Sequence, residues 1–164
     1  MNSLKEIKNN IFNKENFYFL IIILLTFSID RYSKTKATNE LLNNPLYIND
    51  FINFDLVWNT GIGFGLLSFN SSLIYNLISI FICLILIFLI HLAIKADKFD
   101  KLIFSTIVGG AVGNFYDRIV FNAVPDFIDL HIGNFHWFTF NVADIFITLG
   151  ILAFIMKGFF VKND

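Results

Sequence analysis

The chain has 164 residues, a length typical of one domain. Hydrophobic residues make up 56% of it and charged residues 15%, whereas soluble domains carry about 25% charged residues. A globule of this size has too much surface to bury so many apolar side chains, so the composition argues against a soluble enzyme and a disordered chain. The net charge of −1 argues against a nucleic-acid-binding protein, which would carry a basic face. The composition therefore predicts a small multi-pass membrane protein.

Four apolar segments are candidates for membrane-spanning helices, because a span needs about 20 residues. We expect these spans at about 17–34, 73–94, 102–120 and 142–161. The first is short unless its helix continues past Asp30 to Lys34. A basic stretch before a short apolar run is also typical of a signal peptide, but no small-x-small cleavage pattern follows this run. We therefore expect an uncleaved first helix.

The distribution of basic residues predicts the orientation of the chain. Eight of the twelve Lys and Arg residues flank the expected spans on one side: Lys5, Lys8, Lys14, Lys95, Lys98, Lys101, Lys157 and Lys162. The positive-inside rule then places both termini in the cytoplasm and leaves external segments at about 35–71 and 121–141. Residues 51–58 partly alternate apolar and polar side chains, and residues 59–65 contain three glycines. This pattern predicts short strands around a glycine-rich turn.

Polar residues at membrane depth are the most informative part of the sequence. A carboxylate at the centre of a span costs about 2.5–3.5 kcal/mol on insertion scales and indicates a functional site by default. Asp30, Asp117 and Asp144 all map near the external ends of their spans. At helical spacing, three spans each aim a polar stripe inward at this depth. The stripes are Thr26, Asp30 and Lys34; Gly110, Asn114 and Asp117; and Asn141, Asp144 and Thr148.

Small residues at positions 105, 109 and 113 form a second stripe on the third span. Such small-xxx-small series are typical of closely packed membrane helices. We expect these positions to serve helix packing. The adjacent Asp117 and Arg118 are interpreted as structural, neutral or site-supporting residues, because an arginine near the membrane interface can pair within the protein or reach the lipid headgroups.

Two carboxyl groups lie in apolar surroundings. Asp126 stands within Val-Pro-Asp-Phe-Ile, where desolvation predicts a raised pKa, and Asp144 has apolar neighbours on both sides. The chain has no Ser–His arrangement beside them, so this pattern favours an aspartic dyad that shares one proton. Asp129 is expected to be solvated in a loop.

The histidines and the cysteine give no sign of a metal site. His131 and His136 are five residues apart in an expected loop, which is poor spacing for metal ligands. The single cysteine, Cys83, excludes a zinc site built on several cysteines. We expect neither a metal nor a cofactor.

Five segments resemble those of the lipoprotein signal peptidase (signal peptidase II) family, and they occur in the family's order. They are residues 30–34, 59–65, 109–118, 124–127 and 140–144. The segment Gly-Gly-Ala-Val-Gly-Asn-Phe-Tyr-Asp-Arg at 109–118 matches its family pattern without a gap. The resemblance extends from Asp30 to Gly150.

The resemblance implies four transmembrane helices with a small external β-cradle and a short external helix, forming one membrane-embedded peptidase domain over residues 1–164. It implies removal of the signal peptide from diacylglyceryl-modified prolipoproteins, just before the lipidated cysteine, and inhibition by globomycin peptides. The catalytic aspartates would be Asp126 and Asp144. The residues that bind substrate or support the site would be Asp30, Lys34, Asn59, Gly61, Asn114, Asp117, Arg118 and Asn141.

The same resemblance implies a bacterial cytoplasmic (inner) membrane protein whose active site lies near the outer face. Its partners would be lipid-modified prolipoproteins and membrane lipid, and we expect a monomer. A small proton- or ion-coupled transporter is the main alternative, because intramembrane carboxylates also mark ion pathways. The inner halves of the spans are almost purely apolar, which disfavours that alternative. A purely structural membrane subunit would leave the clustered carboxyls unexplained.

Overall fold

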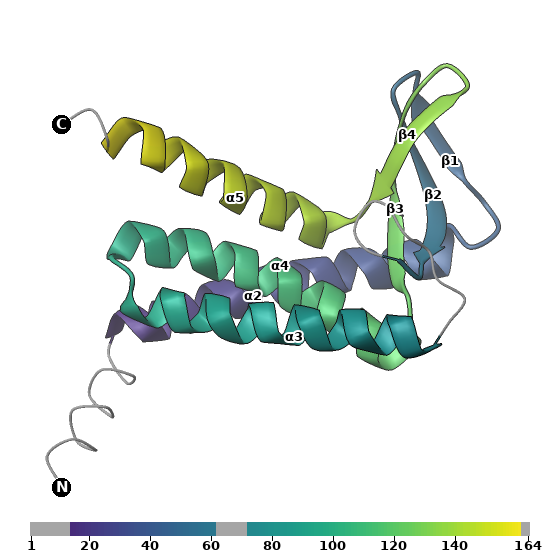
Figure 1. The fold of residues 1–164 in the computed structure, drawn as a ribbon. Helices are drawn as coiled ribbons and strands as arrows, with labels where there is room; N and C mark the ends of the chain where they lie inside the picture. The colour runs from purple at the N-terminus through teal and green to yellow at the C-terminus, as the bar shows by residue number, and fades with distance from the viewer. Residues whose placement is uncertain (1–13, 62–71, 162–164) are drawn as a thin grey trace, which may run out of the picture.

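The computed structural model describes residues 14–61 and 72–161. In these ranges the helices are α2 (Lys14–Glu40), α3 (Ser72–Lys95), α4 (Lys98–Phe121) and α5 (Val142–Val161). The strands are β1 (Leu46–Asn49), β2 (Ile52–Asn59), β3 (Val124–Ile132) and β4 (Phe135–Phe140). The sheet stands at one end of the helices, and the start of α2 and the end of α5 lie at the opposite end (Figure 1).

The helices agree with the expected spans except at the end of the first. The helix α2 continues through residue 40, six residues past the expected end of the first span at about 34. No glycine or proline occurs between Asp30 and Glu40, whereas Pro45 follows shortly after. Buried residues recur every three or four positions along α2, at Thr26, Asp30, Lys34 and Ala37. One face of the helix therefore remains packed against the rest of the protein as far as Ala37.

Within residues 14–61 and 72–161, two helices have the length and apolarity of membrane spans, at Tyr75–Lys95 of α3 and Val142–Phe160 of α5. Their large apolar side chains are mostly exposed; Phe81, for example, is 64% exposed and Phe160 71%. A helix that is apolar on its exposed faces is suited to hydrocarbon rather than to water. The chain is therefore built with lipid-facing surfaces on α3 and α5.

Glycines bring α4 close to two other helices. A Cβ at Gly109 would collide with the Thr26 side chain of α2, and one at Gly113 would collide with Asp30. A Cβ at Gly110 would lie 2.6 Å from the backbone carbonyl of Ala143 in α5. The expectation that these small residues serve close helix packing is confirmed.

The four strands form one antiparallel sheet in the order β1-β2-β3-β4. The strand expected at 51–58 is confirmed as β2, while most of the glycine-rich segment, residues 62–65, lies outside the described residues. Residues 124–140 form the hairpin β3–β4, so the expectation of a loop around Asp129 is wrong. The alternation in Phe-Ile-Asp-Leu-His-Ile at 127–132 and the turn at Gly133, where φ is +57°, account for the hairpin.

The short external helix expected from the resemblance does not occur in residues 14–61 and 72–161, where every helix has 20 residues or more. Residues 62–71 lie outside the described part of the chain.

Candidate active site

A closed ring of hydrogen bonds lies where the sheet meets the helices. Asn114 of α4 donates to Asp144 of α5, which pairs with Asn141, and Asn141 donates to Asp126 of β3. Asp126 also accepts from Asn59 of β2, whose side chain accepts from the backbone of Gly61. Arg118 of α4 closes the ring by donating to the carbonyls of Gly61 and Asn114. The members of the ring are Asn59, Gly61, Asn114, Arg118, Asp126, Asn141 and Asp144.

The start of α5 fixes the position of Asp144. The side chain of Asn141 accepts the backbone N–H of Asp144 at 3.2 Å, and the Asp144 carboxylate accepts the N–H of Asn141 at 3.1 Å. This reciprocal arrangement is a capping box, which satisfies two N–H groups that a helix start leaves unpaired. Asp30 of α2 satisfies another by accepting the N–H of Ala143 at 3.0 Å. The first turn of α5 is therefore fixed by hydrogen bonds from two sides, from Asn141 directly before it and from Asp30 of α2.

Asp126 is almost completely buried, with 2% of its surface exposed. Its carboxylate oxygens accept from the amides of Asn59 at 2.8 Å and Asn141 at 2.6 Å. Burial, and next the nearby charge of Asp144, raise the pKa of Asp126 to about 6, against the lowering effect of the two amides. The raised pKa expected from its apolar surroundings is confirmed.

Asp144 is connected to a buried cation through one amide. Asn114 donates from its side-chain nitrogen to Asp144 at 2.8 Å, while its oxygen accepts from Lys34 Nζ at 2.7 Å. These contacts orient the amide of Asn114, because its oxygen and nitrogen each have a defined partner. The Asn114 side chain thus bridges Lys34 and the Asp144 carboxyl by hydrogen bonds, so the position of Asp144 depends on that of Lys34.

A cluster of four charges supports this side of the ring. Lys34 Nζ donates to Asp30 at 3.0 Å and to Asp117 at 2.8 Å, and Arg31 also pairs with both carboxylates. The side chains of Asp30 and Asp117 are fully buried, and Lys34 is 1% exposed. Two cations balance two carboxylates here, which is the condition under which buried charges are tolerated.

Arg31 is the member of the cluster that the sequence analysis did not single out. It lies inside the segment 30–34, one of the five that resemble the family. This position in the sequence could have indicated that Arg31 belongs to the site. Asp117 and Arg118 do not contact each other as partners, although they are adjacent in sequence. Neighbouring helical residues point in different directions, so Asp117 pairs with Lys34 and Arg31, and Arg118 donates to two backbone carbonyls.

A cavity of about 340 Å³ opens beside the site. It is lined by Arg31, Lys34, Thr35, Thr38, Trp58, Phe121 and Pro125. Lys34 belongs to the charge cluster, and Pro125 directly precedes Asp126 in β3. The cavity therefore adjoins the buried polar groups from the side of α2.

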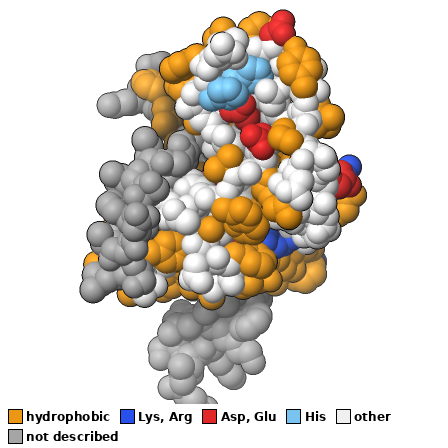
Figure 2. Space-filling model, turned by 90° about the vertical axis from the view of Figure 1, so that its right-hand side faces the viewer, with side chains coloured by type: hydrophobic (Ala, Val, Ile, Leu, Met, Phe, Trp, Pro, Cys, Tyr) orange, Lys and Arg blue, Asp and Glu red, His pale blue; other side chains and the backbone are white. Residues whose placement is uncertain are grey.

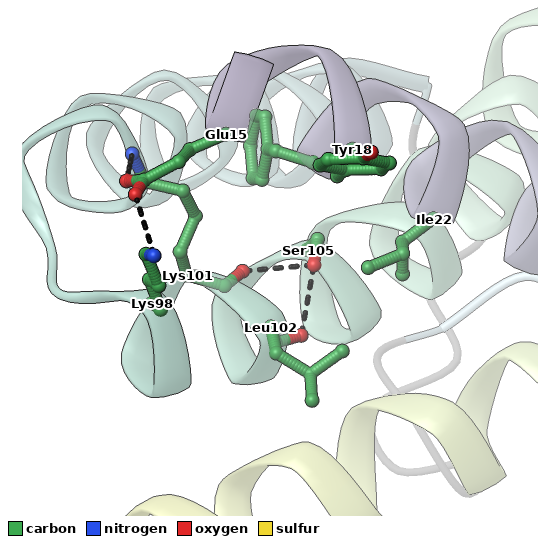
Figure 3. Close-up of a pocket in the computed structure, with 8 residues that line it drawn as sticks. Glu15, Tyr18, Ile22, Lys98, Lys101, Leu102 and Ser105 are labelled. Atoms are coloured by element: carbon green, nitrogen blue, oxygen red, sulfur yellow. Dashed lines mark hydrogen bonds and ion pairs between the residues drawn. The ribbon is translucent and has the colours of Figure 1, made fainter.

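A second cavity has a volume of about 270 Å³, and Figure 3 shows the residues that line it. It is lined from the first turns of α2 and α4, including Glu15, Tyr18, Lys98 and Lys101. Asp30 and Asp117 lie near the other ends of the same helices. This cavity contains none of the residues expected at the active site.

The ten residues expected from the sequence are thus joined in one polar network. Residues 22–160 match the family model described as signal peptidase (SPase) II. The chain belongs to the signal peptidase II family. It is therefore an aspartic peptidase of the membrane, and the transporter alternative has no support.

Several curated relatives of this signal peptidase II are named lipoprotein signal peptidase. The protein of Pelagibacter ubique (strain HTCC1062) is 50% identical over 158 residues, covering 94% of this chain and 95% of the relative. That of Francisella tularensis subsp. novicida (strain U112) is 38% identical over 151 residues, covering 89% and 93%. That of Blochmanniella pennsylvanica (strain BPEN) is 38% identical over 163 residues, covering 95% and 98%.

Two solved structures share the fold, and both are described as bacterial membrane enzyme structures determined by the in meso method. The first, at 2.3 Å resolution, has a TM-score of 0.69 and 29% identity, with 85% of this chain and 86% of that chain covered. The second, at 1.9 Å resolution, has a TM-score of 0.68 and 29% identity, with 85% and 91% covered. This signal peptidase II is accordingly a bacterial membrane enzyme with a known architecture.

Proposed function

We propose that this signal peptidase II removes the signal peptide from diacylglyceryl-modified prolipoproteins, with Asp126 and Asp144 as its catalytic pair. The observation that carries the proposal is the ring in which Asn141 joins the buried carboxyl group of Asp126 to the partly buried carboxyl group of Asp144. A pair of carboxyls held in this way is the arrangement that aspartic peptidases use to activate water.

The charges around the ring favour one proton on the pair. Asp30 and Asp117 are balanced by Lys34 and Arg31, so Arg118 is the remaining cation within the polar network. It offsets only one of the two charges that Asp126 and Asp144 would carry together. Since like charges in a buried site are costly, the neutral arrangement has one carboxyl ionised and one protonated.

In the mechanism that follows, the ionised carboxyl takes a proton from water, which attacks the scissile carbonyl carbon. The protonated carboxyl donates a hydrogen bond to the carbonyl oxygen, where negative charge develops. The proton taken from water then passes to the leaving amine, as in general acid–base catalysis. The pair titrates as a unit, so the two roles belong to the dyad rather than to a fixed residue.

Other members of the network hold the pair and the substrate. Asn59 and Asn141 keep the Asp126 carboxylate in place, and Asn114 does the same for Asp144. Arg118 holds the carbonyl of Gly61 at 3.0 Å and so fixes the chain directly after β2. The substrate backbone would lie against this stretch, and Asn114 and Arg118 would supply donors to a developing oxyanion.

We further propose that all four helices cross the cytoplasmic (inner) membrane of the bacterium as one domain of residues 1–164, with both termini inside. Lys95, Lys98 and Lys101 lie at the end of the helices opposite the sheet, which supports this orientation through the positive-inside rule. The ring then lies near the outer face, where the acyl chains of a lipidated substrate remain in the bilayer. The enzyme would act as a monomer in contact with membrane lipid.

The test of the chemistry is cleavage of a diacylglyceryl-modified prolipopeptide by the full chain in lipid nanodiscs. Asp126→Asn and Asp144→Asn are each expected to abolish turnover, while Asp55→Asn, an exposed carboxyl on β2, serves as the matched control. An unmodified peptide should be cleaved far more slowly than the lipidated one. Near-normal turnover in either site variant would overturn the assignment of the dyad.

The test of orientation is labelling with a membrane-impermeant thiol reagent in a Cys83→Ser background. Asn134→Cys, in the exposed β3–β4 turn, should be labelled in intact spheroplasts, and Lys98→Cys, on an exposed side chain, only after lysis. The reverse pattern would show the opposite orientation.

A further inference from the structure

A second cluster of ionisable side chains lies on the hairpin β3–β4, outside the ring. It contains Asp129, His131 and His136, each with one nitrogen or oxygen atom within 4.8 Å of the others. Histidine and acidic side chains meet in one patch on the sheet end of the molecule (Figure 2). None of the three belongs to the proposed peptidase mechanism.

The backbone brings these residues together through a β-bulge. Asp129 pairs with Thr139 and Leu130 with Phe138, but the register shifts before His131, which pairs with His136. In an unshifted hairpin His131 would face Trp137, so the extra residue in β4 is what places the two imidazoles opposite each other. Asp129 lies two positions before His131 and therefore projects on the same face of β3.

The polar groups of the cluster are incompletely satisfied. His131 is 7% exposed, and its Nδ1 is buried without a hydrogen-bond partner in the described chain. The nearest carboxylate oxygen, Asp129 Oδ2, is 3.6 Å from it, which is beyond a hydrogen bond. The same oxygen lies 2.7 Å from His136 Nδ1, and the two imidazole rings stack with centroids 5.3 Å apart. A buried nitrogen without a partner destabilises the folded protein, so the unpaired Nδ1 of His131 points to a ligand at this position.

We propose that Asp129, His131 and His136 bind one Zn²⁺ ion. Two imidazole nitrogens and a carboxylate oxygen are ligands that zinc prefers, and a water would complete the tetrahedron. Ligand atoms about 2.0–2.1 Å from a tetrahedral zinc lie roughly 3.3 Å from one another. Asp129 Oδ2 lies 3.6 Å from His131 Nδ1 and 2.7 Å from His136 Nδ1, on either side of that value. One ligand atom of each residue lies within 4.8 Å of the other two, so adjustment of the side chains would bring all three to the ion.

Such an ion would tie β3 to β4 at the free end of the sheet. Asp126 is on the same strand, three residues before Asp129, and its contacts point to the ring rather than to the cluster. The zinc site is therefore structural, and the proposal is independent of the proposed dyad. The five-residue spacing that argued against a metal site assumed a loop, whereas the hairpin makes His131 and His136 neighbours.

The proposal is tested with the full chain in nanodiscs, without a polyhistidine tag and after treatment with a chelator. Addition of ZnCl₂ should give one bound ion per chain by elemental analysis. At a 100-fold excess over Kd it should raise Tm by about 5–10 °C. Co²⁺ should give the visible absorption bands of a tetrahedral site.

His136→Ala is the sharpest variant, because this side chain is 59% exposed and its loss is expected to leave the fold intact. It should melt like the wild type without zinc and lose both the zinc-induced shift and the Co²⁺ bands. Asp129→Asn should lose them too. His91→Ala, which removes an exposed histidine of α3, should behave like the wild type. Absence of stoichiometric binding to the wild type, or equal binding to His136→Ala, would overturn the proposal.

Discussion

The side-chain amide of Asn141 donates a hydrogen bond to the Asp126 carboxylate across 2.6 Å. The oxygen of the same amide accepts the backbone N–H of Asp144. One side chain therefore sets the position of both carboxyls and, by stabilising the ionised form of Asp126, opposes the rise in pKa that burial causes.

Replacing Asn141 with alanine should change both the rate and the pH profile. Loss of the donor shifts the pKa of Asp126 upward, so the apparent pKa of the dyad in kcat/KM should move to higher pH. Loss of the cap misplaces Asp144, and we expect kcat/KM to fall by about 100-fold. The profile is measured with a lipidated prolipopeptide between pH 5 and 9. Asn43→Ala, at an exposed position, is the control, and a slower enzyme with an unmoved profile would contradict this role of Asn141.

The helices and the members of the site were largely predictable because each leaves a local signature. Uninterrupted apolar runs set the bounds of α3 and α5, and polar residues at helical spacing marked the inward stripes on α2, α4 and α5. A carboxyl within an apolar strand, such as Asp126, is expected to be buried wherever that strand packs.

The partners within the site were not predictable, because they depend on how distant segments meet. Asp117 is adjacent to Arg118 in sequence, yet its cations come from α2, 83 and 86 residues away. The bulge in β4 that places His136 opposite His131 has no clear signal in an alternating pattern. Sequence periodicity indicates which face a side chain occupies, but not which residue stands across from it.

Gly113 should tolerate no side chain, because an added Cβ would collide with the Asp30 carboxylate. In Gly113→Ala we expect α2 to be displaced from α4, with a loss of about 1–3 kcal/mol in stability and a lower kcat. Gly158→Ala provides a matched control, because nothing lies within 4 Å of a Cβ there. Thermal unfolding and prolipopeptide cleavage measure the two effects. Equal behaviour of the two variants would mean that this helix contact is not rigid.

Lys34→Met should destabilise the enzyme because it leaves the buried Asp30 and Asp117 with Arg31 as their remaining cation in the cluster. Breaking a buried ion pair costs about 3–5 kcal/mol. In contrast, Lys36→Met should cost about 0–1 kcal/mol, because the Lys36–Glu40 pair is exposed. Chemical denaturation in detergent measures the free energy of unfolding. Adding Asp117→Asn to Lys34→Met should restore part of the stability; no recovery would argue against charge imbalance as the cause.

Asp126 should make the stability of the enzyme depend on pH. Its pKa is about 6 in the folded protein and 3.8 in an ordinary carboxyl, so the folded state holds this proton more tightly than the unfolded state. The contribution is complete below pH 3.8 and is lost as pH rises through 6, by about 3 kcal/mol in all, since one pKa unit is worth about 1.4 kcal/mol. Asp126→Asn has no such proton, so its Tm minus that of the wild type should increase between pH 4.5 and pH 8. The difference cancels the titrations of groups that do not interact with Asp126, and Asp55→Asn should show no comparable rise; a flat or falling difference for Asp126→Asn would contradict the raised pKa.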